Sequence, residues 1–230
     1  AALLDHLDVR LQSAMDFARN AASMQQQARS VAAYIASGQA ARDDIDVRLR
    51  QVVQDFEVFA FTQSAPYRNH WVGGGAAGNY QGDYWLRTTV NYAGIWANTA
   101  QEVLYFVATK DSDEKMLDGA NQYVMHFPAD KLPDSVVNAY WSVILVGVPD
   151  YRVVPNELKR YNFNNHSPLK KEADGSLKIG IGPTPPAGVP ESNWLPSPPG
   201  KPFSLTFRTY VRKETVIKGE WQPAPVTRVQ

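Results

Sequence analysis

Residues 138–146 are apolar at nearly every position, which predicts a strand at the centre of the fold. Successive side chains of a strand point to opposite faces. Both faces of this segment are apolar, so the strand must be covered from both sides. One face would carry Tyr140, Ile144 and Val146, and the other Trp141, Val143 and Leu145.

Further strand patterns occupy residues 102–109, 122–127, 176–181 and 203–211, and residues 183–202 between the last two are too rich in proline for a long regular element. Short strands separated by turn signals, and not by long helices, indicate an antiparallel sandwich or barrel. The last strand would carry Phe203, Leu205, Phe207 and Val211 on one face and Ser204, Thr206, Arg208 and Tyr210 on the other.

Helical spacing of apolar residues dominates the first quarter of the chain. Residues 1–37 predict one helix that ends at Gly38, and a second helix is expected to start at Asp43 or Asp44. A third helix is predicted over residues 84–98, with Asp83 as its N-cap. The apolar stripes of the first two helices contain Leu3, Leu7, Leu11, Ile45, Leu49, Val52, Phe56 and Phe59.

These patterns predict an α+β chain in three parts. Residues 1–63 form a helical hairpin or extension, residues 64–83 a glycine-rich linker, and residues 84–230 a β-sandwich domain. The apolar helical stripes are too extensive to face water, so we expect them to cover the sandwich or to form a homo-oligomer.

The linker contains G-x-G-x-x-G at residues 73–78. A dinucleotide site requires a strand directly before this motif and a helix that opens at it. A predicted helix precedes the motif here and the loop continues beyond it, so a connecting loop is the preferred interpretation.

Composition narrows the classes of function. The 230 residues include 23 basic and 23 acidic side chains, so no net charge attracts nucleic acid. The absence of cysteine excludes disulfides, thiolate metal sites and thiol catalysis, and it is compatible with the cytoplasm and the periplasm alike. No apolar run is long enough for a membrane span, and no basic segment followed by an apolar core opens the chain, so we expect no intact signal peptide.

Residues 85–229 contain a series of short motifs in a characteristic order. They are Leu117-Asp118-Gly119, Tyr123, Phe127-Pro128, Tyr140-Trp141-Ser142, Asp174-Gly175-Ser176-Leu177, Asn193-Trp194-Leu195-Pro196, Pro202-Phe203 and Trp221 with Pro223 and Pro225. In these motifs the segment resembles the bacterial domain-of-unknown-function family 1214, usually the C-terminal partner of family 1254. The resemblance implies a bacterial protein with a jelly-roll-like β-sandwich. In family members Tyr-Asp often stands where this chain has Val146-Gly147, and residues 1–63 do not resemble the usual partner domain.

Histidine spacing gives no metal motif. His6, His70, His126 and His166 are scattered, and none stands four residues from another, so we expect no structural zinc and no cofactor. His126 lies in an apolar strand, where a packed, hydrogen-bonded histidine is the preferred interpretation over a ligand.

Polar and aromatic residues near the predicted strands are the candidates for ligand binding. An arginine among aromatic rings suits a planar anion or a sugar, although a structural arginine paired with Glu102 or Asp118 is the simpler interpretation. Trp194 in the proline-rich loop is interpreted as an anchor for that loop, with a sugar-stacking platform as the alternative. The candidates are Arg87, Glu102, Tyr105, Asp118, Tyr123, His126, Arg208 and Tyr210.

Two functions of different classes remain open. The first is a non-catalytic binding or structural module with an aromatic-rich cleft. The second is an enzyme of the hydrolase or lyase type that acts on a carbohydrate or another small polar substrate. The chain has no G-x-S-x-G, and Ser142 lies inside a predicted strand and not on a sharp turn, so the first is favoured.

Overall fold

The structure is a computed structural model of the chain, and it describes residues 21–75, 78–80, 82–94 and 97–229. The chain divides into a helical unit and a sheet unit. The helical unit holds the described residues up to Ser64 together with Tyr80–Thr89, and the sheet unit holds Ala65–Asn79 and everything from Val90 onward. The division into residues 1–63, 64–83 and 84–230 stays a prediction.

The helical unit contains α2 (Ala21–Ala36), α3 (Gln39–Thr62) and the first part of α4 (Tyr84–Gly94). Helix α3 begins earlier than the sequence indicated, with Gly38 as its N-cap at φ 146°, so the predicted cap at Asp43 or Asp44 is wrong. Glycine tolerates this backbone angle because it has no Cβ. The predicted stripe at Leu3, Leu7 and Leu11 lies outside the described residues.

Few side chains of the helical unit are fully buried. Among them, Ile35 is 3% exposed and Ala41 is 6% exposed. The indole of Trp85 packs edge-on against the ring of Phe59, with 5.5 Å between ring centroids. Asp83 caps α4 as predicted, since its Oδ1 accepts a hydrogen bond of 2.9 Å from the backbone N–H of Leu86.

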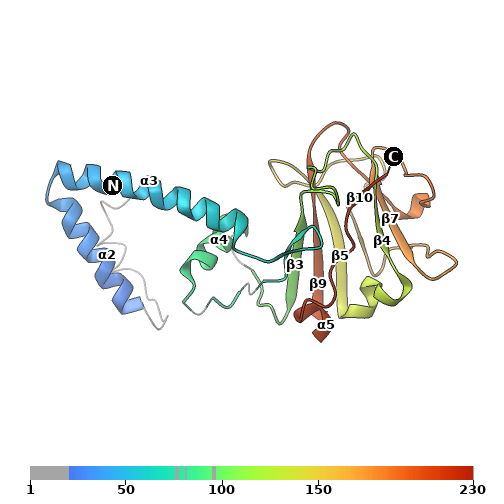
Figure 1. Ribbon diagram of the computed structural model, residues 1–230, viewed down its shortest axis with the longest axis horizontal. Coiled ribbons are helices and arrows are strands. Elements are labelled where there is room, and N and C mark those ends of the chain that lie inside the picture. Colours follow the sequence, from blue (N-terminus) through green and yellow to red (C-terminus); the bar gives the residue numbers. More distant parts are fainter. Residues whose placement is uncertain (1–20, 76–77, 81, 95–96, 230) are drawn as a thin grey trace. The chain divides into compact units, whose positions relative to one another are not determined.

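The sheet unit is built from two sheets (Figure 1). Every strand pair is antiparallel except β7–β8, which is parallel, so the prediction of a purely antiparallel fold holds for most of the unit but not for this pair. The larger sheet has the order β1 (Tyr67–Arg68), β2 (Trp71–Gly73), β3 (Val103–Ala108), β9 (Phe203–Arg212), β5 (Val137–Gly147) and β6 (Asn162–Asn164). The smaller sheet has the order β10 (Thr227–Arg228), β4 (Tyr123–Phe127), β7 (Leu177–Gly182) and β8 (Trp194–Pro196).

Short helical turns connect several strands. They are η2 (Ala129–Lys131), η3 (Pro133–Val136), η4 (Glu191–Asn193) and α5 (Glu214–Ile217).

The core lies between the two sheets and is centred on the ring of Phe207. Trp141 of β5 stacks on this ring at 5.6 Å and 4°, and Phe127 of the smaller sheet lies 6.2 Å from it. Trp141 is 1% exposed, which confirms that it is a core residue. The two faces predicted for residues 138–146 are confirmed, with the Trp141 face buried. The Tyr140 face is only half-buried, so the prediction that both faces are covered holds only in part.

Three local predictions are wrong. The loop at residues 64–83 contains the β1–β2 hairpin, which pairs with β3 and extends the larger sheet. Val211 does not face the core, since its φ of 46° turns the strand and leaves the side chain 47% exposed. Trp194 lies on a short strand and not in a loop, and its indole N–H donates to the carbonyl of Gly182, which supports the anchoring interpretation.

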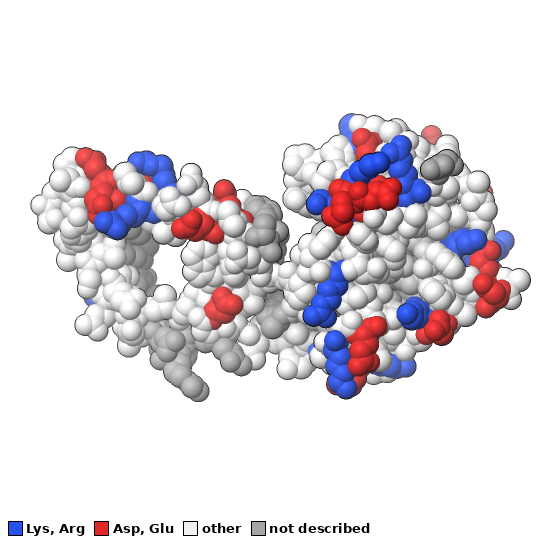
Figure 2. Space-filling view, viewed as in Figure 1, with Lys and Arg blue, Asp and Glu red and all other residues white. Residues whose placement is uncertain are grey.

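No helix among the described residues is long and apolar enough to cross a membrane. On the face shown in Figure 2, basic and acidic side chains lie beside one another and do not gather into a patch of one sign. This distribution agrees with the zero net charge of the chain.

Candidate functional site

The outward face of the larger sheet carries a row of polar side chains across four strands. Tyr105 of β3 pairs in register with Arg208 of β9, Arg208 pairs with Ser142 of β5, and Ser142 pairs with Asn164 of β6. Residues opposite each other in an antiparallel sheet point to the same face. All four side chains therefore lie on the side that faces away from the core.

A second row, of rings, lies next to the first. Tyr140 and Tyr210 are register partners, with ring centroids 5.8 Å apart. His166, just beyond β6, lies 6.4 Å from the ring of Tyr140. We call the surface formed by both rows the Arg208 face. It consists of Tyr105, Tyr140, Ser142, Asn164, His166, Arg208 and Tyr210.

The guanidinium of Arg208 is the most distinctive group on this face. Its Nε is buried and has no hydrogen-bond partner, and the residues that the structure describes give Arg208 no ion pair. A guanidinium stays charged at any ordinary pH, and a buried donor without a partner is costly. The structural interpretation, in which Arg208 pairs with Glu102 or Asp118, is therefore wrong for the described part of the chain.

The phenol of Tyr105 stays protonated beside this cation. Burial is the main cause that raises the pKa of Tyr105, and the neighbouring Tyr210 hydroxyl raises it further, while the charge of Arg208 acts in the opposite direction. The face thus offers a cation and a hydroxyl donor side by side. Glu102, at the start of β3, is exposed and lies near enough to influence Tyr105 electrostatically.

Other predicted site residues have structural roles. Tyr123 is buried, and its hydroxyl accepts a hydrogen bond of 3.0 Å from the backbone N–H of Asp118. The carboxylate of Asp118 accepts from the N–H of Ala120, so both residues shape the turn before β4. These contacts do not support the predicted role of Tyr123 and Asp118 in ligand binding.

The last two candidates lie elsewhere. His126 is exposed on β4 opposite Lys178, so the expectation of a packed histidine is wrong. Arg87 is exposed on α4, in the helical unit. The structure therefore brings together Tyr105, Arg208 and Tyr210, with Glu102 at their edge, and separates the rest.

The ligand-binding candidates predicted from the sequence do not include four members of the Arg208 face: Tyr140, Ser142, Asn164 and His166. The alternation of β5 placed Tyr140 opposite Trp141, and that signal was available. Strand β6 is only three residues long and had no recognisable pattern, so nothing in the sequence joined Asn164 or His166 to β5.

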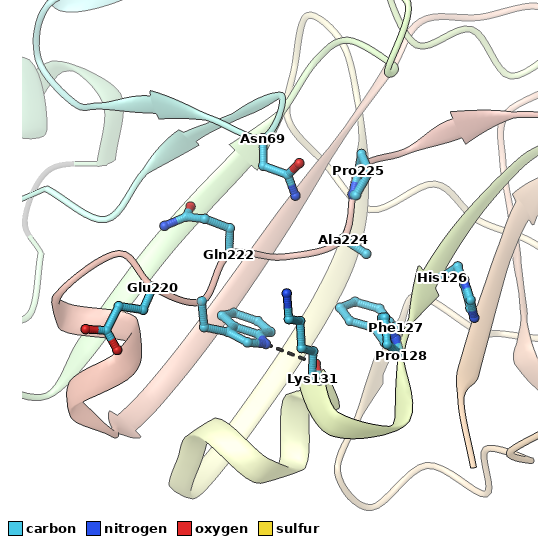
Figure 3. Close-up of a pocket in the computed structure, with 10 residues that line it drawn as sticks. Asn69, His126, Phe127, Pro128, Lys131, Glu220, Gln222, Ala224 and Pro225 are labelled. Atoms are coloured by element: carbon cyan, nitrogen blue, oxygen red, sulfur yellow. Dashed lines mark hydrogen bonds between the residues drawn. The ribbon is translucent and has the colours of Figure 1, made fainter. Parts of the chain in front are cut away.

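A pocket of about 380 Å³ opens elsewhere on the sheet unit (Figure 3). Its walls come from the β1–β2 turn at Asn69, from residues 126–131 and from residues 220–225. It shares no residue with the Arg208 face. His126, Lys131 and Glu220 are among its lining residues.

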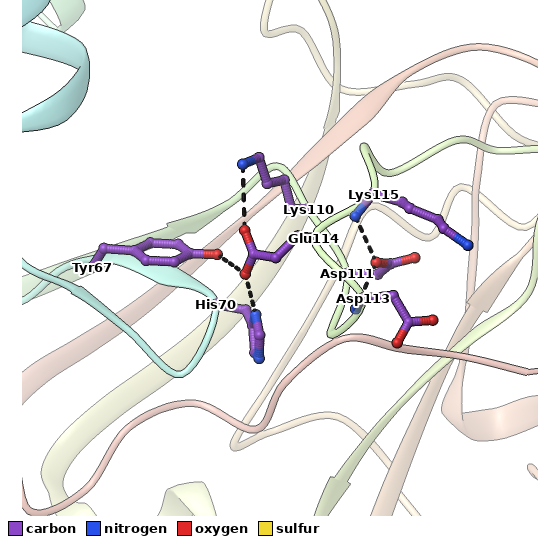
Figure 4. Close-up of polar contacts among 7 residues, drawn as sticks. All are labelled: Tyr67, His70, Lys110, Asp111, Asp113, Glu114 and Lys115. Carbon is purple, nitrogen blue, oxygen red and sulfur yellow. Dashed lines mark hydrogen bonds and ion pairs between the residues drawn. The ribbon is translucent and has the colours of Figure 1, made fainter.

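A polar cluster centred on Glu114 fastens the β1–β2 turn to the loop after β3 (Figure 4). One carboxylate oxygen of Glu114 lies 2.6 Å from the hydroxyl of Tyr67 and 2.6 Å from Nδ1 of His70, and the other lies 3.3 Å from Nζ of Lys110. The bonds from Tyr67 and then His70 hold the pKa of Glu114 at about 2. Burial, followed by the bond to Glu114, raises the pKa of Tyr67 to about 12.

Metal binding finds no support in the described ranges, where no group of three or more His, Asp or Glu side chains could hold an ion. The Glu114 cluster consists of one carboxylate and the groups that donate to it. We call it the Glu114 latch, because it connects the β1–β2 turn to the loop after β3.

The Arg208 face lies within a segment that matches a known protein family. Residues 102–214 match the family model described as "Protein of unknown function (DUF1214)". This segment is a DUF1214 domain. The DUF1214 domain contains every residue of the Arg208 face, whereas the pocket also uses Asn69 and residues 220–225, which lie outside it. Association with family 1254 stays an expectation.

Two solved structures are similar to the chain that contains this DUF1214 domain. The VPA0106 protein from Vibrio parahaemolyticus matches with a TM-score of 0.59 and 20% identity over 95% of this chain and 47% of that protein. The chain thus spans about half the length of that protein, and the likeness shows the fold alone. An uncharacterised protein from Burkholderia cenocepacia matches 58% of this chain over 31% of its own length, with 18% identity and a TM-score of only 0.34. No curated protein matches the chain.

Proposed function

We propose that the DUF1214 domain of this chain is a non-catalytic binding module, and that its Arg208 face binds a small polar ligand with an anionic group, such as an acidic sugar. The observation that carries the proposal is the buried Nε of Arg208, which lacks a hydrogen-bond partner among the described residues. A ligand oxyanion bound to the guanidinium would neutralise a charge that no described residue pairs.

The surroundings of Arg208 suit such a ligand. The planar guanidinium binds carboxylates through two parallel hydrogen bonds, whereas a lysine offers only a point charge. The rings of Tyr105, Tyr140 and Tyr210 add apolar surface and hydroxyls, as a sugar ring with its hydroxyl groups requires. The amide of Asn164 adds a further donor and acceptor in the same row.

A binding role is favoured over catalysis by the contacts of the polar groups. Ser142, the hydroxyl nearest to Arg208 in register, makes no hydrogen bond to a histidine or carboxylate within the described ranges. Nucleophilic catalysis requires a base in hydrogen-bond reach of the nucleophile.

Calorimetric titration with D-glucuronate tests the proposal, with D-glucose as the uncharged comparison. Arg208→Gln should weaken glucuronate binding at least about tenfold, because hydrogen bonds to charged groups contribute about 1.5–3 kcal/mol. Arg208→Lys should give an intermediate loss, since it keeps the charge and removes the fork. Arg228→Gln is the matched control, because it removes an exposed arginine from β10 of the other sheet.

The proposal fails if Arg228→Gln weakens binding as much as Arg208→Gln, or if glucose binds as tightly as glucuronate. It also fails if the unmodified chain does not bind glucuronate or any other acidic sugar tested in the same way.

An enzyme of the hydrolase or lyase type, acting on a carbohydrate at the same face, is the second candidate. The observation that favours it is the position of Tyr105 opposite Arg208, where the phenol hydroxyl could donate a proton to a leaving oxygen of a bound substrate. Incubation with a uronate-containing oligosaccharide, followed by chromatography of the products, decides between the two. Turnover that Tyr105→Phe abolishes while binding persists would replace the binding module by an enzyme.

We also propose that the helical unit mediates self-association. Large apolar side chains on it are exposed, among them Tyr34, Val47, Val52 and Val53, and exposed apolar patches often mark interfaces. Sedimentation velocity of the full chain against residues 65–230 tests this. Equal oligomeric states of the two would contradict it.

The finer description of the fold belongs with these proposals. We propose that the two sheets are wound as a jelly roll, because the chain alternates between them, from β3 to β4, then β5, then β7. An experimental structure with another strand order would overturn this description.

A further inference from the structure

A pocket beside residues 220–225 is separate from the Arg208 face. Its walls come from segments far apart in the sequence, and hydrogen bonds hold them together. The indole N–H of Trp221 donates to the carbonyl of Lys131 at 3.0 Å, and the amide of Asn69 donates to the carbonyl of Pro223 at 2.7 Å. These bonds fix the walls through the backbone, so a ligand would find the pocket already shaped.

Part of the pocket lining is apolar. Phe127, Trp221, Ala224 and Pro225 contribute to its lining, and the N–H of Trp221 is already occupied. The pocket therefore offers hydrophobic surface there and no hydrogen-bond donor from the indole. Its volume of about 380 Å³ lies in the range of small-molecule sites, which is about 300–1,000 Å³.

One charged group points into the pocket. In Figure 3 the ammonium of Lys131 is directed toward the middle of the pocket, whereas the carboxylate of Glu220 points away from it. The described residues provide Lys131 with no side-chain hydrogen bond and no ion pair. His126, which also lines the pocket, adds an imidazole and no negative charge. The charge that faces the pocket is therefore positive.

We propose that this pocket binds a small monocarboxylate with a flat apolar body, an aromatic acid in particular. The carboxylate would pair with the ammonium of Lys131, and the apolar body would cover Trp221 and Phe127. A lysine supplies a point charge, which suits a single carboxylate oxygen and demands no planar fork. The site is independent of the Arg208 face, because the two share no residue.

Nuclear magnetic resonance of the full chain with ¹⁵N-labelled tryptophan tests the proposal. The chain has six tryptophans, and Trp221→Phe identifies the indole signal of Trp221 by its loss. Titration with benzoate should shift this signal in the unmodified chain. Benzamide, which has the same ring without the charge, should bind at least about tenfold more weakly, as expected for loss of a charged hydrogen bond.

Lys131→Met should weaken benzoate binding by a similar factor. This change keeps most of the side-chain volume and leaves the backbone carbonyl that Trp221 uses. Lys201→Met, at an exposed lysine elsewhere, is the control and should bind benzoate like the unmodified chain. Unchanged binding by Lys131→Met, equal binding of benzamide, or no response of Trp221 to benzoate would each overturn the proposal. Arg208→Gln should leave benzoate binding unchanged, so failure at one site is distinguishable from failure at the other.

Discussion

Replacing Trp141 by alanine is the strongest test of how the sheet unit is packed. The indole is 1% exposed, it stacks on Phe207 at 5.6 Å and 4°, and its N–H donates to the carboxylate of Asp134 at 2.7 Å. Truncation of a buried tryptophan costs about 3–5 kcal/mol, because the transfer free energy is lost and a cavity remains. Asp134 is exposed, so its carboxylate can return to water and adds little to this cost.

A loss of that size is a large share of the roughly 5–15 kcal/mol that stabilises a typical domain. Urea unfolding followed by near-ultraviolet circular dichroism measures it, provided that the slope with denaturant is unchanged. Trp194→Ala is the matched control, since Trp194 is only half-buried and lies on the three-residue strand β8. It should cost clearly less. If Trp141→Ala unfolds like the parent while Trp194→Ala collapses, the packing of both sheets around Phe207 has been misjudged.

Two further predictions concern the Glu114 latch and the turn before β4. Because the folded pKa of Glu114 is about 2, below its ordinary 4.5, its contribution to stability is complete above about pH 5 and is lost as the pH falls toward 2. Thermal melts of Glu114→Gln should therefore differ from the parent at pH 6 and converge with it near pH 2, and a constant difference would contradict the latch. Gly119→Ala should destabilise the sheet unit by about 1–3 kcal/mol in urea melts, because the new Cβ would clash with the carbonyl oxygen of Pro198, and a neutral effect would show that this turn relaxes freely.

The long strands could be predicted because their pattern is local. The alternation around Trp141 and Phe207 predicted both faces of β5 and, apart from Val211, both faces of β9, and Asp83 marked the start of α4. The alternation of apolar side chains and the capping residue of a helix are local in sequence, so both can be recognised without a structure.

The β1–β2 hairpin was missed because its turn is unusual. Asn69 and His70 both have left-handed backbone angles, with φ of 51° and 67°, where Asn-Gly is the ordinary signal. Positive φ is uncommon for residues other than glycine, and Asn-His is not an ordinary hairpin signal, so a two-residue turn could not be expected here. The bond from His70 to Glu114 holds it there, and that contact spans 44 residues.

The candidate site was predicted only in part for a related reason. Arg208 and Tyr210 were recognised on one strand, and Tyr105 was included from another. Joining them to Tyr140 and His166 requires the register of β5 with β9, which includes an irregularity between Val137 and Tyr140. Register is a property of paired strands and cannot be read from either strand alone.

A crystal structure of the chain grown with D-glucuronate would test the binding role of the Arg208 face most directly. We expect the ligand carboxylate to lie against the guanidinium of Arg208, with nitrogen–oxygen distances of about 2.7–2.9 Å, and the sugar ring to lie against Tyr140 or Tyr210. Density for the sugar at any other surface, with the Arg208 face vacant, would contradict it.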